Sequence, residues 1–215
     1  EEAEMRSRTL EVESKREREF MSLTAHQLYT PLSIIRGFVA NLLSGTYGKL
    51  APKQEETAKE IHTSTKRLVK LVGDLLSISR IESEKYSLNK QFIDLSALSR
   101  EVVAQSQVLL DKKPVKLTFE EPSVKLPKIS ADPERLRSVL LNLVDNAIKY
   151  TPKGTITVLA RLGANGKSQI VEVKDTGVGI KQEDFEKLFQ PFTRGKNIFE
   201  LDNKGTGLGL YISRL

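Results

Sequence analysis

The chain has no cysteine and no tryptophan, and only two of its 215 residues are histidines. The lack of cysteine excludes a disulfide framework and any chemistry that needs a thiolate. Two histidines are too few for a metal site built on several imidazoles. The sequence also has no long uncharged apolar run and no signal peptide pattern, so we expect no membrane contact from these residues and a cytoplasmic location. A segment upstream of Glu1 could still anchor a longer protein in a membrane.

Positive charge is in slight excess over negative charge. Lys and Arg number 34 against 28 Asp and Glu, which gives a net charge of +6. The basic residues are scattered along the chain, and tryptophan is missing, so the sequence does not favour a nucleic-acid surface. A mild positive balance suits a triphosphate and an acidic protein partner. The length allows one large domain or two modest ones, with 39% hydrophobic residues to supply a core.

The stretch from Phe20 to Phe38 is predicted to be a helix with a reactive side chain beside its packed stripe. His26 lies next to the stripe and should be open to solvent, and Thr30 shares its face one turn later. Pro31 has no backbone N–H, so we expect it to bend the helix. The stripe follows from apolar residues at alternating steps of three and four, which are Ala25, Leu28, Leu32, Ile35, Val39 and Leu42.

Two helices and a polar extension make up the expected first part of the chain. Residues 1–18 are almost all charged or polar and run on without Gly or Pro, which we interpret as a signal-input helix from an upstream sensor domain; an arbitrary chain boundary is the alternative. Residues 19–86 should form an antiparallel hairpin. Its first helix is predicted to end near Ser44–Gly45 and its second to run from Pro52 to about Lys85, with His62 at the surface or at the edge of the stripe. The second stripe is Ile61, Thr65, Leu68, Val72 and Leu75.

One such hairpin leaves too much apolar surface exposed to be stable alone. Pairing two copies about a twofold axis buries both stripes in a four-helix bundle. We therefore predict a homodimer.

Residues 87–94 are predicted to be a linker, and residues 95–215 a domain of mixed α and β composition. Asp132 is a good helix N-cap and Pro133 fits the first helical position, so a helix should run from Pro133 to Tyr150. The other expected elements are a helix over Leu95–Leu110, a strand over Val115–Phe119, a short strand over Lys128–Ser130, and a hairpin of strands over Thr155–Leu162 and Gln169–Asp175.

A polar face on the Pro133–Tyr150 helix is the first candidate ligand site. Asn142, Asn146 and Lys149 share this face, and asparagine is a poor helix former. An amide oxygen suits Mg²⁺, a lysine can neutralise phosphate, and Tyr150 offers an aromatic wall for a base. Two solvent-facing asparagines on a packed helix are the simpler alternative.

Glycine-spaced strings follow this helix. Asp175 comes at the end of a strand and is followed by Gly177 and Gly179, which let the backbone pass close to a ligand. Arg194 follows an aromatic–Pro–aromatic anchor, and the polar residues 195–204 are predicted to be a mobile lid. The stretch from Gly205 to Leu210 then leads into a helix. Its glycine spacing fits neither the dinucleotide fingerprint nor the P-loop.

These strings together resemble the sensor histidine kinases of two-component systems. HQLYTPL, residues 26–32, is similar to their phospho-acceptor box and departs from it at Gln27 and Tyr29. The later strings resemble the N, G1, F and G2 boxes of the ATP-binding domain shared with gyrase, MutL-type and heat-shock ATPases, known as the GHKL type. The resemblance implies an α+β fold, with a helical hairpin followed by an α/β sandwich of GHKL type. The family chain continues past the G2 helix into further strands, so we interpret the end at Leu215 as a truncation.

Carried over residue by residue, the resemblance implies an ATP·Mg²⁺ site. Asn146 would ligate Mg²⁺ with Asn142 nearby, and Lys149 would contact phosphate. Tyr150 would flank the adenine, and Asp175 would bind its amino group. The other implied cofactor-binding residues are Gly177, Gly179 and Ile180 around the pocket, Arg194 at the phosphates, and Gly205, Thr206, Gly207, Leu208, Gly209 and Leu210 at the lid.

The implied function is phosphorylation of His26 from ATP and transfer of the phosphate to an aspartate of a response regulator, with Thr30 serving a reverse phosphatase reaction. Gln27 replaces the usual acid and cannot accept a proton at neutral pH, so we expect either a slow kinase step or, with Thr30 retained, a balance shifted toward dephosphorylation. A nucleotide-binding dimeric scaffold without catalysis is one alternative. A gyrase-type ATPase is another, but its water-activating carboxylate would have to be Glu134, which lies too close to the helix start.

Overall fold

The computed structural model describes residues 2–82, 87–110, 113–193 and 205–215. The chain divides into two compact units, Glu1–Tyr86 and Ser87–Arg214, and each is described by itself. Among the described helices, none combines the length and the hydropathy that crossing a bilayer requires.

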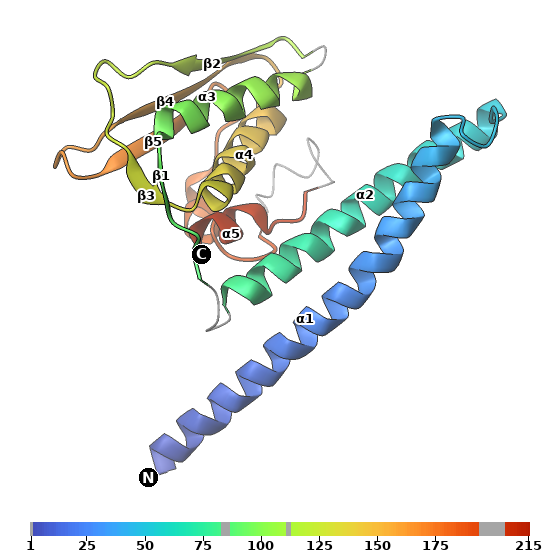
Figure 1. Cartoon of the computed structure of the whole chain (residues 1–215), viewed down its shortest axis with the longest axis horizontal. Helices are drawn as coiled ribbons and strands as arrows, with labels where there is room; N and C mark the ends of the chain where they lie inside the picture. The colour runs from blue at the N-terminus through green and yellow to red at the C-terminus, as the bar shows by residue number, and fades with distance from the viewer. Residues whose placement is uncertain (1, 83–86, 111–112, 194–204) are drawn as a thin grey trace. The chain divides into compact units, whose positions relative to one another are not determined.

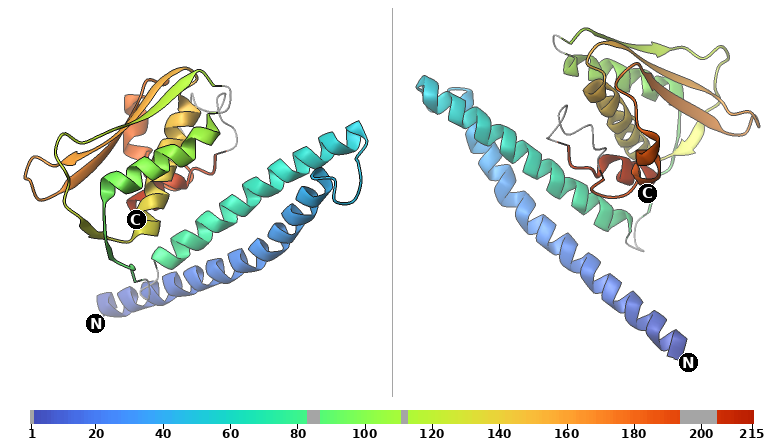
Figure 2. Two further views of the ribbon diagram at one scale, coloured as in Figure 1. Left: turned by 45° about the horizontal axis from the view of Figure 1, so that its top comes forward. Right: turned by 180° about the vertical axis from the view of Figure 1, so that it is seen from behind.

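The first unit is a hairpin of two long helices, α1 (Glu2–Leu43) and α2 (Pro52–Ile81), which lie side by side (Figures 1 and 2). α1 remains α-helical through Pro31, and the bend expected there stays a prediction. The N-terminal end of α2 is closed by the Gln54 side chain, whose Oε1 accepts a hydrogen bond from the Ala51 amide at 3.0 Å. The residues beyond Glu82 where α2 was expected to end lie outside the described part of the chain.

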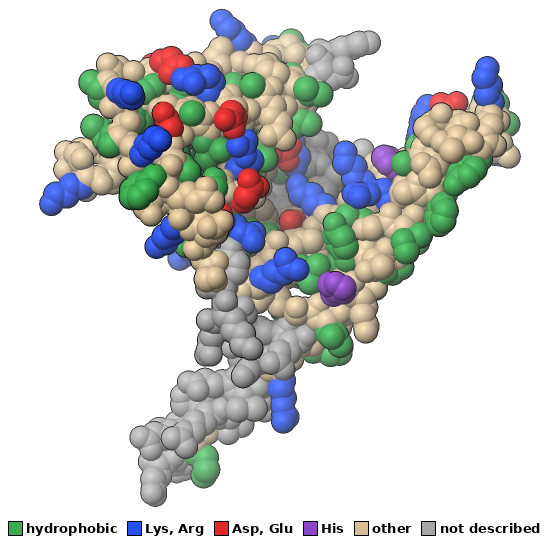
Figure 3. Space-filling view, viewed as in Figure 1, with side chains coloured by type: hydrophobic (Ala, Val, Ile, Leu, Met, Phe, Trp, Pro, Cys, Tyr) green, Lys and Arg blue, Asp and Glu red, His purple; other side chains and the backbone are tan. Residues whose placement is uncertain are grey.

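The two predicted stripes are only half covered within the hairpin. Ala25, Val39, Thr65 and Val72 are buried, with 3 to 7% of their surface exposed. The stripe residues that alternate with them keep almost half of their surface exposed; these are Leu28, Ile35, Ile61 and Leu68. Figure 3 shows apolar side chains following one another along this unit. The hairpin therefore presents an apolar face that its own two helices do not bury.

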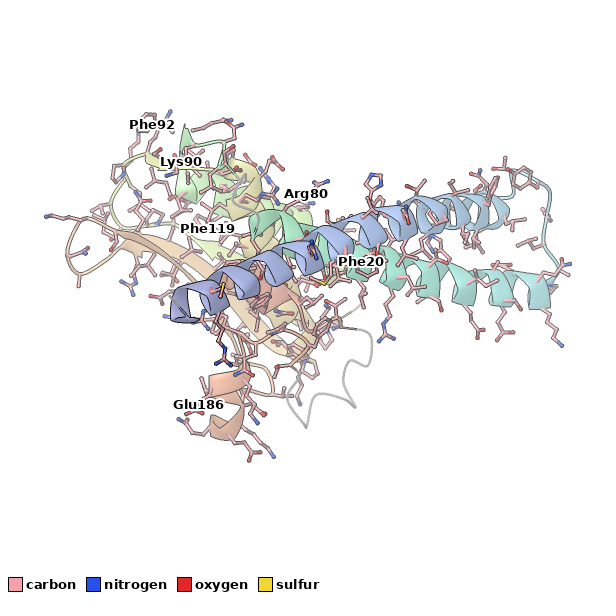
Figure 4. The ribbon with its side chains drawn as sticks, turned by 90° about the horizontal axis from the view of Figure 1, so that it is seen from below. Phe20, Arg80, Lys90, Phe92, Phe119 and Glu186 are labelled. Atoms are coloured by element: carbon pink, nitrogen blue, oxygen red, sulfur yellow. The ribbon has the colours of Figure 1, made fainter. Side chains whose placement is uncertain are left out.

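The second unit begins with a strand that was not predicted. Residues 87–94 were expected to be a linker, but they include β1 (Gln91–Ile93), which pairs antiparallel with β3 (Ile129–Ala131). The linker prediction is wrong for these three residues, because a strand this short has too few side chains to show an alternating pattern. Phe92 on β1 points to the periphery of this unit and is 77% exposed (Figure 4).

A three-stranded sheet and two helices form the body of the second unit. The strand order is β2 (Val115–Glu120), β4 (Gly154–Leu162), β5 (Gln169–Asp175), with β2 parallel and β5 antiparallel to β4. The helices α3 (Leu95–Ser106) and α4 (Pro133–Tyr150) pack on one face of the sheet (Figure 1). The helix predicted to reach Leu110 ends at Ser106 and continues as a 3₁₀ turn, η1 (Gln107–Leu109). The predicted class, a helical hairpin followed by an α/β domain, is confirmed.

Between this helix layer and the sheet lies the core. Val144 of α4 and Ile156 of β4 are fully buried, and Val102 of α3 and Val158 of β4 are 1% exposed. Burying a side chain of this size stabilises the fold by about 1.5–3 kcal/mol. α4 therefore cannot slide or rotate on the sheet without exposing these residues, and this fixes the direction of its polar face.

The start of α4 is held by a cap that the sequence predicted. Asp132 Oδ1 accepts hydrogen bonds from the backbone amides of Glu134 and Arg135 at 3.1 and 3.2 Å. Its Oδ2 accepts a third bond, from the Asn89 amide at 3.0 Å. The bond from Arg135 is the largest cause of a pKa of the Asp132 carboxyl below its ordinary value, and burial opposes it. The cap thus ties the segment before β1 to the helix that carries the candidate site.

Candidate functional site

The candidate acceptor residues lie on a solvent-exposed turn of α1. His26, Gln27 and Thr30 are all exposed. The Thr30 hydroxyl donates to the carbonyl oxygen of His26 over 3.5 Å, within the same helical turn. Pro31 has no N–H to give to the Gln27 carbonyl, so this turn lacks one bond of the helical ladder. The imidazole is therefore carried by a packed helix and remains accessible to a reagent from solvent.

Two of the three residues predicted on the polar face of α4 keep part of their surface exposed. Asn146 and Lys149 are both half-buried. Lys149 Nζ forms an ion pair with Asp145 Oδ2 at 2.8 Å, one helical turn away. This lysine thus already has an anionic partner, which a phosphate would have to replace or share. Asn142, the third residue, donates a hydrogen bond to the Ser213 hydroxyl.

The end of β5 is joined to the end of α4 by the predicted glycine string. A Cβ added at Gly177 would lie 2.2 Å from the Tyr150 carbonyl oxygen, so only glycine fits there. The next amide, that of Val178, donates to the same carbonyl at 3.1 Å. Gly179 has a φ of 68°, in the left-handed region that glycine tolerates best, and Ile180 is exposed. The packing of Gly177 and Val178 on the Tyr150 carbonyl fixes the position of the backbone that follows Asp175.

One oxygen of the Asp175 carboxylate is held by the protein. Its Oδ1 accepts a hydrogen bond from the Gly177 amide at 2.9 Å and a longer one from the Thr151 hydroxyl at 3.5 Å. The Asp175 side chain is exposed. With Oδ1 occupied in this way, Oδ2 is the atom placed to accept a hydrogen bond from an amine of a ligand.

Thr151 is a site residue that the sequence reasoning missed. It is fully buried, directly after Tyr150 at the end of α4, and its hydroxyl reaches Asp175 across 24 positions of the chain. The only local signal is a threonine between the helix end and Pro152, which reads as an ordinary helix stop. Its role becomes visible only once β5 is placed beside α4.

The glycines near the end of the chain also pack closely. A Cβ at Gly207, whose φ is 72°, would lie 3.0 Å from the Phe192 carbonyl carbon. Phe192 itself has a φ of 59°, which is unusual for a residue other than glycine. Leu208 is fully buried, and α5 (Gly209–Arg214) begins directly after it, as predicted. Gly205, Thr206 and Leu210 are half-buried, whereas Arg194 and the predicted lid over 195–204 lie outside the described residues.

The predicted residues therefore fall into two groups. His26, Gln27 and Thr30 belong to the hairpin unit. The nucleotide candidates that the structure describes belong to the second unit, on α4, the end of β5 and the start of α5, and α4 contacts both of the other elements. Within the described ranges, no group of three or more His, Cys, Asp or Glu side chains could hold a metal. An amide oxygen of Asn146, completed by phosphate and water oxygens, is a donor set that Mg²⁺ accepts.

Comparison with known families assigns both units. Residues 16–84 match the His Kinase A (phospho-acceptor) domain, and residues 131–215 match the family described as histidine kinase-, DNA gyrase B-, and HSP90-like ATPase. The chain belongs to the sensor histidine kinase family. The predicted resemblance is confirmed, and the two matches fall on the unit that carries His26 and on the unit that carries Asn146 and Asp175.

Individual relatives agree with this assignment. The histidine protein kinase DivJ of Caulobacter vibrioides is 35% identical over 195 residues, which cover 91% of this chain and 32% of the relative. The crystal structure of full-length ShkA in complex with AMPPNP has a TM-score of 0.73 at 28% identity and covers 90% of this chain and 39% of that chain. Histidine kinase ThkA, solved in complex with the response regulator protein TrrA, has a TM-score of 0.58 at 26% identity, over 92% of this chain and 59% of that chain.

The chain spans only part of such proteins. It matches 24 to 32% of the length of the first three curated relatives, which include the circadian input-output histidine kinase CikA of Synechococcus elongatus.

Proposed function

We propose that this chain transfers the γ-phosphoryl group of ATP to His26 and then to an aspartate of a response regulator. The observation that supports the proposal is that α4, which carries Asn146, contacts both the glycine string after Asp175 and the start of α5, while the packed helix of the other unit carries an exposed histidine. ATP also accounts for the cytoplasmic location that we infer, because the nucleotide is supplied there.

In the nucleotide site, Asp175 accepts a hydrogen bond from the exocyclic amine of adenine through Oδ2, and Tyr150 flanks the ring. Lys149 moves from Asp145 toward the phosphates, which carry more negative charge. Asn146 offers its amide oxygen to Mg²⁺, which when bound neutralises phosphate charge. Arg194 and the glycines from Gly205 to Gly209 complete the contacts with the phosphates, as the family resemblance implies.

At the acceptor, the lone pair of the unprotonated imidazole nitrogen of His26 attacks the γ-phosphorus. The bond from that phosphorus to the bridging oxygen breaks, ADP leaves with the electron pair, and the proton on the second ring nitrogen is released to water. Gln27 has no basic atom to take it. Catalysis rests on positioning and on charge neutralisation, as in other phosphoryl transfers.

The partners we propose are a second copy of the chain and the receiver domain of a response regulator. The apolar face formed by Leu28, Ile35, Ile61 and Leu68 supports the dimer, since pairing two hairpins would cover it. The complex of ThkA with TrrA supports the regulator as the phosphate acceptor. An upstream sensor domain that acts through residues 2–18 of α1 belongs to the same proposal, and Thr30 would orient water when the regulator is dephosphorylated.

Labelled ATP with Mg²⁺ tests the function directly. The expected result is incorporation of γ-³²P that is labile in acid and stable in base, as a phosphoramidate is. His26→Ala should abolish the label while leaving nucleotide binding intact, and His62→Ala, on the second helix, should keep it. Label that persists in His26→Ala would overturn the assignment of the acceptor.

A second candidate function is a nucleotide-binding scaffold that signals without catalysis. Gln27 favours it, because the usual acid is absent at this position. Binding of AMPPNP by the wild-type protein, together with no phosphorylation of His26 and none after Gln27→Glu, would support the scaffold. A gyrase-type ATPase is less well supported, since Glu134 lies in the first turn of α4 and is exposed.

A further inference from the structure

Asn142 lies on the polar face of α4 but makes its contacts with α5. Its amide nitrogen Nδ2 donates a hydrogen bond to Ser213 Oγ at 2.9 Å, across 71 positions of the chain. Ser213 Oγ in turn donates to the Gly209 carbonyl oxygen at 3.0 Å, one turn earlier in α5. Both bonds are partly buried, so water competes for them less than at an exposed site.

The direction of the second bond decides the orientation of the amide. A carbonyl oxygen only accepts, so the single hydroxyl proton of Ser213 is used on Gly209. The hydroxyl oxygen is then left to accept, and Asn142 must turn its NH₂ group toward it. Oδ1 of Asn142 consequently faces the Cα of Gly209.

Gly209 makes this orientation possible. A Cβ built on Gly209 would lie 2.1 Å from Asn142 Oδ1 and 2.9 Å from its Cγ. Any side chain there would push the amide away and break its bond to Ser213. Asn142, Ser213 and Gly209 therefore form one cluster of contacts, in which the start of α5 packs directly on the Asn142 amide.

We propose that Ser213 is a positioning residue for the nucleotide site, and that it acts through the amide of Asn142. Ser213 orients the Asn142 amide, and together they hold Gly209 against α4. Leu208, the residue before Gly209, is thereby kept fully buried, and Gly207 is placed next to Phe192. The inference rests on the proposed function, since the residues positioned in this way are those expected to meet ATP.

The test compares three variants in AMPPNP binding with Mg²⁺, measured by isothermal titration calorimetry. Ser213→Ala removes one intramolecular hydrogen bond that links two elements and should weaken binding by about 2- to 12-fold. Ser213→Thr keeps a hydroxyl that can bond the carbonyl four residues earlier and should bind within about twofold of wild type. Ser138→Ala is the matched control, because the Ser138 hydroxyl bonds the Glu134 carbonyl of its own helix, at 2.8 Å.

A double-mutant comparison separates positioning from direct contact. If Asn142 acts through α5, Asn142→Ala and the double variant with Ser213→Ala should bind AMPPNP equally, because one change has already broken the link. In autophosphorylation, Ser213→Ala should raise KM for ATP and leave kcat near wild type.

Two results would overturn the inference while leaving the proposed function intact. One is Ser213→Ala binding as tightly as Ser138→Ala. The other is a loss in the double variant equal to the product of the two single losses, which means that Asn142 and Ser213 act independently. Failure of the wild-type protein to bind AMPPNP would instead overturn the proposed function itself.

Discussion

The exposed apolar face of the hairpin allows the strength of the proposed dimer to be worked out. Ile35 keeps 46% of its surface exposed, and covering a whole Ile side chain stabilises by about 1.5–3 kcal/mol. Covering the remaining half in a dimer is then worth about 0.7–1.5 kcal/mol for each copy. Ile35→Ala removes most of this twice in a symmetric dimer. We expect a loss of roughly 1–3 kcal/mol, or about a 5- to 150-fold rise in the dimer dissociation constant.

Sedimentation equilibrium over a range of concentrations measures this constant. Alanine favours helix more than isoleucine does, so the hairpin itself should not unfold, and circular dichroism should show unchanged helix content. Leu109→Ala is the matched control, since Leu109 is 53% exposed in the other unit. A wild-type monomer at micromolar concentration, or an Ile35→Ala dimer as tight as that of the control, would refute the reasoning.

Three further predictions concern the site and its support. Thr151→Val keeps the buried volume and removes the hydroxyl bonded to Asp175, so KM for ATP should rise about 2- to 10-fold with kcat little changed, whereas Thr151→Ser should stay near wild type. The pKa of Asp132 is lowered in the fold, so its stabilising effect is complete above the ordinary carboxyl pKa and is lost as pH falls through the lowered value. The free energy of unfolding from urea titrations should therefore fall in acid for the wild type, and fall less for Asp132→Asn. Gln27→Glu should speed phosphorylation of His26, by up to about 10²-fold in ³²P incorporation, and equal rates would show that residue 27 does not limit the step.

Much of the fold could be predicted because its signals are local. The start of α4 follows from Asp132 and Pro133, and the two hairpin helices follow from apolar residues at steps of three and four. The parallel pairing of β2 with β4 could not be predicted, since Val115 and Gly154 meet only through contacts distant in sequence. β1 was missed because three residues cannot display a period of two.

The candidate site divides in the same way. Gly177 was predicted from its spacing, and the structure gives the reason, a backbone approach that excludes a Cβ. Thr151 and Ser213 were missed because each is a single polar residue with no spacing to mark it. Asn142 was expected to lie near the metal ion, and the structure adds a bond from its amide to Ser213 of α5 that no spacing indicates. Spacing locates residues on a face but does not say which neighbour that face will meet.

The missing ladder bond at Pro31 has a mechanical consequence. An α-helix resists twisting through its i to i−4 hydrogen bonds. The turn that carries His26 lacks the bond to the Gln27 carbonyl, because Pro31 has no N–H to donate. Torque applied along α1 would therefore be absorbed most readily at this turn. The direction in which the imidazole points would change at this turn before the rest of α1 responds. A small rotation of α1 would then change the side from which His26 meets a phosphate donor.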